Sequence, residues 1–240
     1  MTTRPAPALA AVLLDFDGTL VDTEPLWGQG EIDLLGARGV PWTEDQARRL
    51  CGTSRQVSMR ALLDQMARHG VDVDAIDPIA FYDELWRTVY DAAVRDGLPW
   101  LPGVVDLLAD LADEGIPCAL VSSSPWPMLD ACLELFPRHN ISVVVSGDDV
   151  PAGKPAPDGY LMAAGRLGVD PTHCLVIEDS ASGTAAGLAA GAVVVAVPHM
   201  RPLHDSPGQV MLEDLAGMTT ARLRKLFASV RAGLPTGGTR

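Results

Sequence analysis

The chain has 240 residues and a mass of 25.4 kDa, and 48% of its residues are hydrophobic while 20% are charged. This composition suffices for one large folded domain or for two unequal ones. Lysine and arginine number 18 against 31 aspartate and glutamate residues, so the formal net charge is −13. Nucleic acid is therefore disfavoured as a partner, because the mean field around the chain repels a polyanion. An acidic chain that handles phosphate needs local cations or a metal ion to reverse the potential at its site.

We expect a cytoplasmic protein with no membrane partner. No apolar run reaches membrane-spanning length, and Pro5 and Pro7 interrupt the region where a signal peptide would carry its apolar core. The oligomeric state stays open between a monomer and a weak homo-oligomer. The cysteines are scattered without a CxxC pair, which is typical of free thiols in a reducing compartment; they are Cys51, Cys118, Cys132 and Cys174.

Short β-branched runs recur along the chain, and stretches of helical length separate them from the second run onward. The runs are Ala11–Leu14, Cys118–Val121, Ile141–Val145, Cys174–Ile177 and Ala192–Val197. This alternation predicts an α/β fold with a Rossmann-like, doubly wound parallel sheet. We assign no role to the loop Pro198–Pro207, and we expect a last helix near Thr219–Arg231.

A helical insertion separates the first two expected strands. It runs from Thr23 to Gly97 and contains helical stretches at Glu31–Ala37, Ser54–Arg68 and Ile79–Arg95. Because this block is too long for a simple crossover, we expect a separate subdomain. The predicted domains are a catalytic core of residues 1–22 and 98–240 and an inserted α-helical subdomain of residues 23–97.

Polar side chains follow four of the expected strands, in the loops Asp15–Leu20, Ser122–Ser124, Gly147–Lys154 and Glu178–Ser182. The carboxyl ends of parallel strands meet at one edge of a sheet, and ligands bind there. Carboxylates, a hydroxyl and a lysine that converge at this edge predict a functional site, since packing does not require them.

The first of these loops, Asp15–Leu20, resembles the DxDGTL motif of the haloacid dehalogenase-like superfamily of phosphohydrolases and phosphomutases. The other superfamily motifs are matched in order by Ser122 in VSSS, Lys154 in GKPAPDGY and Glu178-Asp179 in IEDSASG. A lone DxD pair is also typical of a cap or turn, but four motifs in register are specific. The resemblance covers nearly the whole chain except its last stretch.

Hydrolysis of a phosphate monoester needs charge neutralisation, a positioned nucleophile and a proton donor. Asp15 suits the nucleophile, which would form an aspartyl-phosphate. Asp17 suits the general acid and base, because the strand ends here and Gly18 lets the backbone turn. The resemblance makes the Asp17 carbonyl a metal ligand. Asp15, Asp179 and Glu178 would offer hard oxygen ligands to Mg²⁺, although acids near a helix start are also common caps.

A hydroxyl and an ammonium group complete the expected phosphate site. Ser122 is expected to donate a hydrogen bond to the transferring phosphoryl group, with Ser123 as a further phosphate-binding candidate and Ser124 as an adjacent alternative. Serine clusters are also common simple caps. Lys154 is expected to hold its ammonium against the phosphate and the Asp15 carboxylate.

By the resemblance, the insertion is a helical C1-type cap that closes over the site and excludes water. Its segment from Cys51 to Ser58 is similar to the specificity loop of β-phosphoglucomutase-like and sugar-phosphatase members. Gly52, Thr53 and Arg55 are therefore substrate-contact candidates. An equally good and compatible interpretation is that Thr53 or Ser54 caps the following helix while Arg55 is a solvated first-turn residue.

Phosphatases and mutases of the family use the same aspartates. β-Phosphoglucomutases carry a histidine in the first cap helix where this chain has Trp27, and the segment Asp22–Trp27 instead resembles bacterial hexose-phosphate phosphatases. Trp27 is a candidate pocket residue, although an aromatic residue on such a helix is more often core. Asp17 argues against dehalogenation, and the absence of lysine from Thr23 to Gly97 argues against phosphonatase chemistry.

The sequence thus predicts an Mg²⁺-dependent phosphoric monoester hydrolase acting on a small phosphorylated metabolite, most readily a sugar phosphate. The first alternative is a β-phosphoglucomutase-like sugar phosphomutase. The second is a catalytically silent binding module, which would have no need for the full set of Asp15, Asp17, Ser122, Lys154 and Asp179.

Overall fold

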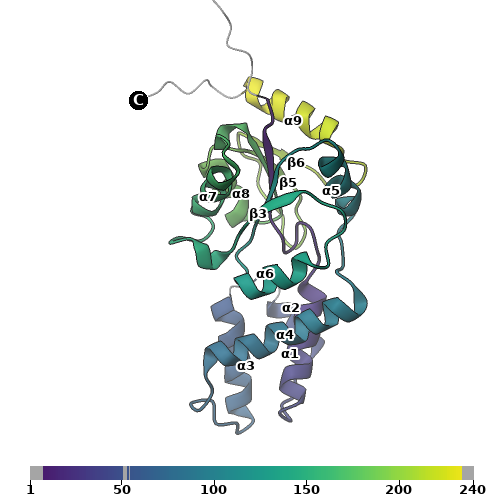
Figure 1. Ribbon diagram of the computed structural model, residues 1–240. Coiled ribbons are helices and arrows are strands. Elements are labelled where there is room, and N and C mark those ends of the chain that lie inside the picture. Colours follow the sequence, from purple (N-terminus) through teal and green to yellow (C-terminus); the bar gives the residue numbers. More distant parts are fainter. Residues whose placement is uncertain (1–7, 51–52, 54, 234–240) are drawn as a thin grey trace, which may run out of the picture. The chain divides into compact units, whose positions relative to one another are not determined.

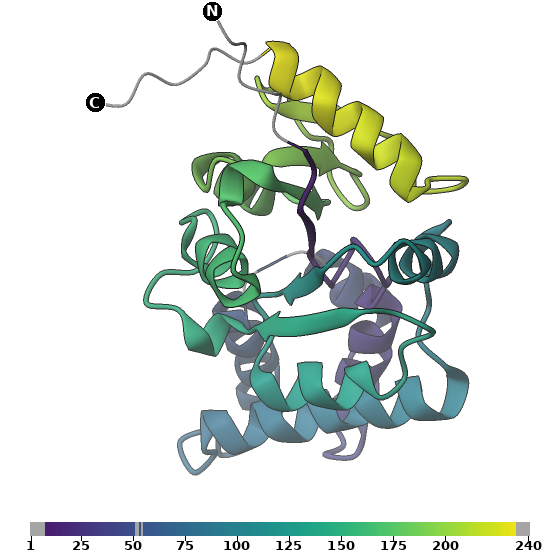
Figure 2. The ribbon, with the colours of Figure 1, turned by 45° about the horizontal axis from the view of Figure 1, so that its top comes forward.

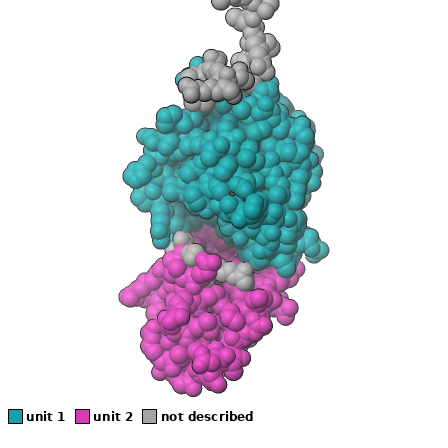
Figure 3. Space-filling view, turned by 90° about the vertical axis from the view of Figure 1, so that its left-hand side faces the viewer, with its two compact units in different colours: residues 1–21, 100–240 teal, residues 22–99 magenta. Residues whose placement is uncertain are grey.

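The structure is a computed structural model that describes residues 8–50, 53 and 55–233. The chain divides into two compact units, one of residues 1–21 and 100–240 and one of residues 22–99 (Figure 3). The predicted domain boundaries lie next to these bounds, and the functions assigned to the two domains stay predictions. No helix in the described part of the chain has both the length and the hydropathy needed to cross a membrane.

The first unit is built on a six-stranded parallel sheet of order β3-β2-β1-β4-β5-β6. β1 pairs with β2 on one side and β4 on the other, so it is an interior strand. β1, β2, β4 and β5 are buried along their whole length, as expected for strands covered on both faces. The strands are β1 Ala11–Leu14, β2 Cys118–Val121, β3 Ile141–Val145, β4 Cys174–Glu178, β5 Val193–Ala196 and β6 Gln209–Met211.

Helices cover both faces of this sheet. Figure 1 and Figure 2 show α7 and α8 on one face and α5 and α9 on the other. Alternate strand residues such as Leu13 and Val176 pack with Tyr160 of α7 and Ala186 of α8 in one core cluster, because successive side chains of a strand point to opposite faces. The α/β Rossmann-like prediction is confirmed. The helices are α5 Val104–Asp113, α6 Trp126–Leu133, α7 Asp158–Leu167, α8 Ala181–Ala189 and α9 Thr220–Gly233, with the short 3-10 turns η1 Gly147–Asp149 and η2 Pro171–His173.

Sequence analysis missed β6. This strand has three residues, all half-buried, and it pairs with β5 at the edge of the sheet. Only one of its residues, Val210, is β-branched, so it lacks the run that marks the other strands. The segment Pro198–Pro207 is the loop that joins β5 to β6.

The second unit is helical, and none of its described residues lies in a strand. Its core contains Leu35, Leu62 and Phe81, with several half-buried tryptophans packed around them. The first helix begins at Glu24, seven residues before its predicted start, because Pro25 occupies the first turn, where proline is tolerated. The helices are α1 Glu24–Gly36, α2 Glu44–Leu50, α3 Arg55–Arg68 and α4 Pro78–Asp96.

Candidate active site

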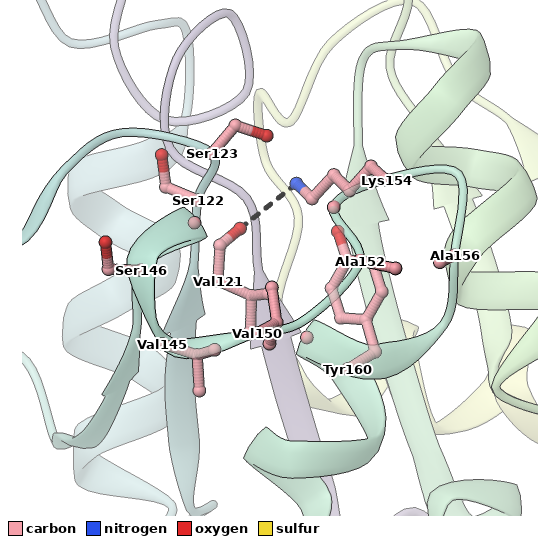
Figure 4. Close-up of a pocket in the computed structure, with 13 residues that line it drawn as sticks. Val121, Ser122, Ser123, Val145, Ser146, Val150, Ala152, Lys154, Ala156 and Tyr160 are labelled. Carbon is pink, nitrogen blue, oxygen red and sulfur yellow. Dashed lines mark hydrogen bonds between the residues drawn. The ribbon is translucent and has the colours of Figure 1, made fainter.

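The side chain of Lys154 lies at the carboxyl ends of three neighbouring strands. Its Nζ is 2.5 Å from Oδ1 of Asp15 after β1, 2.6 Å from Oε1 of Glu178 at the end of β4, and 3.1 Å from the carbonyl oxygen of Val121 in β2. Figure 4 shows the ammonium directed at this carbonyl. The side chains of Lys154 and Asp15 are each 10% exposed, so this ion pair is largely shielded from water. Residues far apart in sequence are thus brought to one point.

Glu178 accepts hydrogen bonds at both of its carboxylate oxygens. Oε1 receives the Lys154 ammonium and the Tyr160 hydroxyl, the latter at 3.0 Å. Oε2 receives the backbone N–H of Ser180 at 3.0 Å and its hydroxyl at 2.9 Å. A Cβ atom at Gly183, in the first turn of α8, would lie only 1.6 Å from Oε1. The carboxylate therefore occupies space that only glycine leaves open at the start of this helix.

Asp179, the next residue, faces the loop after β1. The Thr19 hydroxyl donates to its Oδ1 over 3.3 Å. Gly18 has a φ of 83°, and a Cβ atom there would lie 2.4 Å from Oδ2 of Asp179. Glycine is required at this turn both for its backbone conformation and for the close approach of the carboxylate.

Asp15, Glu178 and Asp179 form a group that fits a metal ion. Each offers a carboxylate oxygen, and these atoms lie within 4.8 Å of one another. Such hard anionic oxygens are the ligands that Mg²⁺ and Ca²⁺ prefer. Since both oxygens of Glu178 already accept hydrogen bonds, Glu178 would bind a cation only by sharing an oxygen with those donors. Asp15 and Asp179 are the less constrained ligands.

The electrostatics of the site also favour a cation. Burial raises the pKa of Asp15 well above its usual range, Glu178 adds repulsion, and the Lys154 ammonium opposes both effects. Burial, followed by the Glu178 charge, raises the pKa of Asp179 to about 7. Burial alone would lower the pKa of Lys154, but the Asp15 and Glu178 carboxylates outweigh it and hold that pKa well above the ordinary value. One lysine thus faces three carboxylates, and additional positive charge would relieve their repulsion.

Asp17 lies in the turn that follows β1. The backbone N–H groups of Thr19 and Leu20 donate to the Phe16 carbonyl, so the chain reverses directly after the strand. The half-buried Asp17 carboxylate accepts hydrogen bonds at Oδ2 from the hydroxyl of Ser124 at 2.8 Å and from that of Ser122 at 3.5 Å. The loop after β2 therefore faces the second aspartate of the motif.

The two predicted phosphate-binding serines differ in exposure. Ser122 is buried, and its hydroxyl oxygen accepts the backbone N–H of Ser124 at 3.0 Å, whereas Ser123 is exposed. Both border a cavity of about 20 Å³ that Lys154 and Tyr160 also line (Figure 4). Such a volume holds about one water molecule. It is too small for a phosphorylated metabolite, so a substrate must bind outside it.

The substrate candidates of the second unit are described only in part. Gly52 lies outside the described residues, and so does the side chain of Arg55, the first residue of α3. The Thr53 hydroxyl donates to the Leu50 carbonyl at 2.7 Å. Trp27 packs against the core of this unit and stacks on Tyr82, with ring centroids 5.9 Å apart. Substrate contacts by these residues stay predictions.

Sequence analysis did not identify Tyr160 or Ser180 as parts of the site. Tyr160 lies six residues after Lys154 and Ser180 lies two residues after Glu178. This proximity to motif residues was the available signal, but spacing alone does not reveal which hydroxyl points toward the carboxylate.

A doubly wound α/β core with a lysine and three carboxylates at the carboxyl edge of its strands defines a class of enzyme suited to phosphoryl transfer. The family model for haloacid dehalogenase-like hydrolases matches residues 9–191. The chain therefore belongs to the haloacid dehalogenase-like hydrolase family, whose members are typically metal-dependent.

Curated relatives and solved structures agree with this membership. The chain is 32% identical over 231 residues to hexitol phosphatase B of Escherichia coli strain K12, covering 90% of this chain and 96% of that protein. It is 31% identical over 184 residues to a phosphorylated carbohydrates phosphatase of Thermotoga maritima, covering 76% and 82%. The crystal structure of CbbY from Rhodobacter sphaeroides in complex with phosphate superposes with a TM-score of 0.73 at 26% identity, covering 89% and 98%. The predicted class, a phosphoric monoester hydrolase, is confirmed.

Proposed function

We propose that the chain is an Mg²⁺-dependent phosphatase that hydrolyses a small phosphorylated metabolite through an aspartyl-phosphate on Asp15. The observation that carries this proposal is the buried contact of the Lys154 ammonium with both Asp15 and Glu178, beside Asp179. Sugar phosphates and hexitol phosphates are the substrate class to which the names of the relatives point.

Asp15, Asp179 and the backbone carbonyl of Asp17 would hold the Mg²⁺ ion, with Glu178 beside them. The carboxylates are hard donors whose mutual repulsion at this site calls for a cation. When bound, Mg²⁺ supplies positive charge that neutralises the phosphate oxygens and lowers the repulsion between substrate and nucleophile.

In the first step, a carboxylate oxygen of Asp15 attacks the phosphorus atom and the ester P–O bond breaks. Lys154 restrains the attacking carboxylate through the 2.5 Å contact and keeps it from rotating away. Ser122 donates a hydrogen bond to the phosphoryl oxygens, with Ser123 as a second donor. Asp17, as the carboxylic acid, gives its proton to the departing oxygen, so the product leaves as a neutral alcohol.

In the second step, the Asp17 carboxylate accepts a proton from water as the water oxygen attacks the phosphorus of the aspartyl-phosphate. The acyl phosphate bond breaks, which regenerates the Asp15 carboxylate and releases inorganic phosphate. Asp17 is then protonated and ready for the next substrate, so protons balance over the cycle.

The proposal extends to the second unit, which would act as the cap that chooses the substrate. Arg55, Gly52, Thr53 and Trp27 are its candidate contacts. Trp27 is half-buried and packs on Tyr82, so its first role is structural and a substrate contact would be a second one.

We also propose a cytoplasmic enzyme that acts as a monomer or weak homo-oligomer without nucleic-acid partners. The net charge of −13 disfavours polyanions. Cys118, Cys132 and Cys174 are buried free thiols, as is common in a reducing compartment. Light scattering of the purified protein would measure the oligomeric state.

The experiment that tests the function is phosphate release from a panel of hexose, hexitol and other small phosphomonoesters, with Mg²⁺ and with chelator. Asp15→Asn is the nucleophile-free blank. Asp130→Asn, on the exposed face of α6, is the matched control and should release phosphate at the wild-type rate. Release that requires both Mg²⁺ and Asp15 supports the proposal.

Wild-type-level hydrolysis by Asp15→Asn would exclude the aspartyl-phosphate mechanism. Absence of phosphate release, combined with isomerisation of a sugar phosphate primed by a bisphosphate, would identify a phosphomutase instead. Absence of both activities would leave a binding module.

A further inference from the structure

The Asp17 carboxylate is in contact with a serine that the proposed mechanism does not use. The hydroxyl of Ser124 donates to Oδ2 of Asp17 over 2.8 Å, whereas the phosphate-binding candidate Ser122 lies 3.5 Å from the same oxygen. Ser124 and Asp17 are 107 positions apart in sequence, so their contact is formed by the fold and not by local sequence.

The backbone of Ser124 is held on both sides. Its N–H donates to the Ser122 hydroxyl oxygen at 3.0 Å, and its carbonyl accepts the Ser146 hydroxyl at 2.8 Å and the Gly147 N–H at 3.4 Å. Gly147 also lies so close to Ser123 that a Cβ atom at position 147 would be 2.6 Å from the Ser123 carbonyl oxygen. The loops after β2 and β3 thus fix Ser124, and its hydroxyl meets Asp17 from a rigid support.

We propose that Ser124 is a positioning residue for the proton transfer performed by Asp17. This inference rests on the proposed phosphatase function. As the ester P–O bond breaks, the Asp17 carboxylic acid transfers its proton to the leaving oxygen and becomes a carboxylate. The Ser124 O–H donates to this carboxylate, which holds it in one orientation and stabilises the charge that the proton leaves behind.

The dependence of the rate on the leaving group distinguishes a role of Ser124 in proton donation from a role in substrate binding or in structural support. A leaving group that departs readily as an anion needs little protonation, whereas a poor one depends on the general acid. Aryl phosphates with different ring substituents vary this property while keeping the substrate size nearly constant. kcat/KM reports the steps up to cleavage of the P–O bond, so it isolates the proton donation from the later hydrolysis.

We expect Ser124→Ala to change kcat/KM for p-nitrophenyl phosphate by less than about twofold and to lower it for phenyl phosphate by about tenfold, the effect of one hydrogen bond to a charged group. Asp17→Asn should show the same trend more strongly. In an Asp17→Asn background, Ser124→Ala should add no further dependence on the leaving group.

Two variants that are isosteric with each other distinguish loss of the hydroxyl from a general loss of structure. Ser124→Thr keeps a hydroxyl and should show the wild-type dependence on the leaving group. Ser124→Val places a side chain of nearly the volume of threonine there without a hydroxyl, and should behave as Ser124→Ala does. Ser142→Ala, an exposed serine of β3, is the matched control and should behave as the wild type. Thermal melting checks that each variant is folded.

Equal losses of kcat/KM on all aryl phosphates, or no loss on any, would each overturn the role of Ser124. If the wild type accepts no aryl phosphate, acetyl phosphate and the best sugar phosphate provide the same contrast in leaving group. Failure of the proposed function itself has a different signature, because the wild type would then release phosphate from no substrate or Asp15→Asn would stay active.

Discussion

Glu31 of α1 is a buried carboxyl whose removal should stabilise the protein at neutral pH. The residue is 5% exposed, and its Oε2 accepts the indole N–H of Trp42 at 3.0 Å. Burial raises its pKa from 4.5 to about 7, partly offset by the Trp42 hydrogen bond, and the charge of Glu24 adds to the rise. Replacement by glutamine keeps an oxygen acceptor for Trp42 and removes the charge that burial disfavours.

The magnitude follows from the two pKa values. A pKa of about 7 in the folded chain against 4.5 in the unfolded chain corresponds to about 3 kcal/mol, of which about 2.5 kcal/mol falls between pH 5 and pH 8. Between these two pKa values the folded chain retains a proton that the unfolded chain has released, so rising pH lowers the free energy of unfolding. Glu31→Gln should abolish this part of the pH dependence.

The assay is urea unfolding followed by circular dichroism at several pH values from 5 to 8. The quantity to compare is the difference in free energy of unfolding between Glu31→Gln and the wild type, since other titrating groups cancel in that difference. It should become more favourable to the variant by about 2.5 kcal/mol as the pH rises from 5 to 8. Glu213→Gln, at an exposed position, is the control and should shift stability by less than about 0.5 kcal/mol throughout. Parallel curves for Glu31→Gln and the wild type would refute the buried-charge explanation.

Three substitutions test the site more directly. Asp17→Asn should keep metal binding in calorimetry while phosphate release falls by about a hundredfold, and turnover near the wild-type rate would contradict its acid-base role. Gly183→Ala should displace the Glu178 carboxylate and lower phosphate release by at least about tenfold, since its Cβ would lie 1.6 Å from Oε1; Gly165→Ala on α7, where nothing lies within 4 Å, is the control. Arg55→Ala should raise KM with little change in kcat, and unchanged constants across several sugar phosphates would remove Arg55 from the substrate contacts.

The fold was largely predictable because the interior strands carry contiguous β-branched runs and the motif residues follow them directly. β6 was not predicted because an edge strand of three half-buried residues needs little apolar sequence. The start of α1 was not predicted because a proline such as Pro25 suggests a helix boundary, whereas the structure places Pro25 inside the first helical turn.

The convergence of Asp15, Lys154 and Asp179 could be predicted from topology, since parallel strands bring their carboxyl ends together. The partners of individual oxygens could not. Sequence reasoning offered Glu178 as a metal ligand, which stays a prediction, but it did not reveal that the Glu178 oxygens accept hydrogen bonds from a lysine, a tyrosine and a serine. Such pairings depend on side-chain directions at contacts between distant segments, which local patterns do not encode.

The position of β1 between β2 and β4 has a further consequence for how the protein opens. Amide hydrogens of an interior strand exchange with solvent only when its neighbours also separate, whereas edge strands exchange through local fraying. Deuterium labelling should therefore reach β6 early and β1 last. Asp15, attached to the end of β1, keeps its place through partial openings at either edge of the sheet, whereas Lys154 follows the edge strand β3 and is lost from the site when that edge opens.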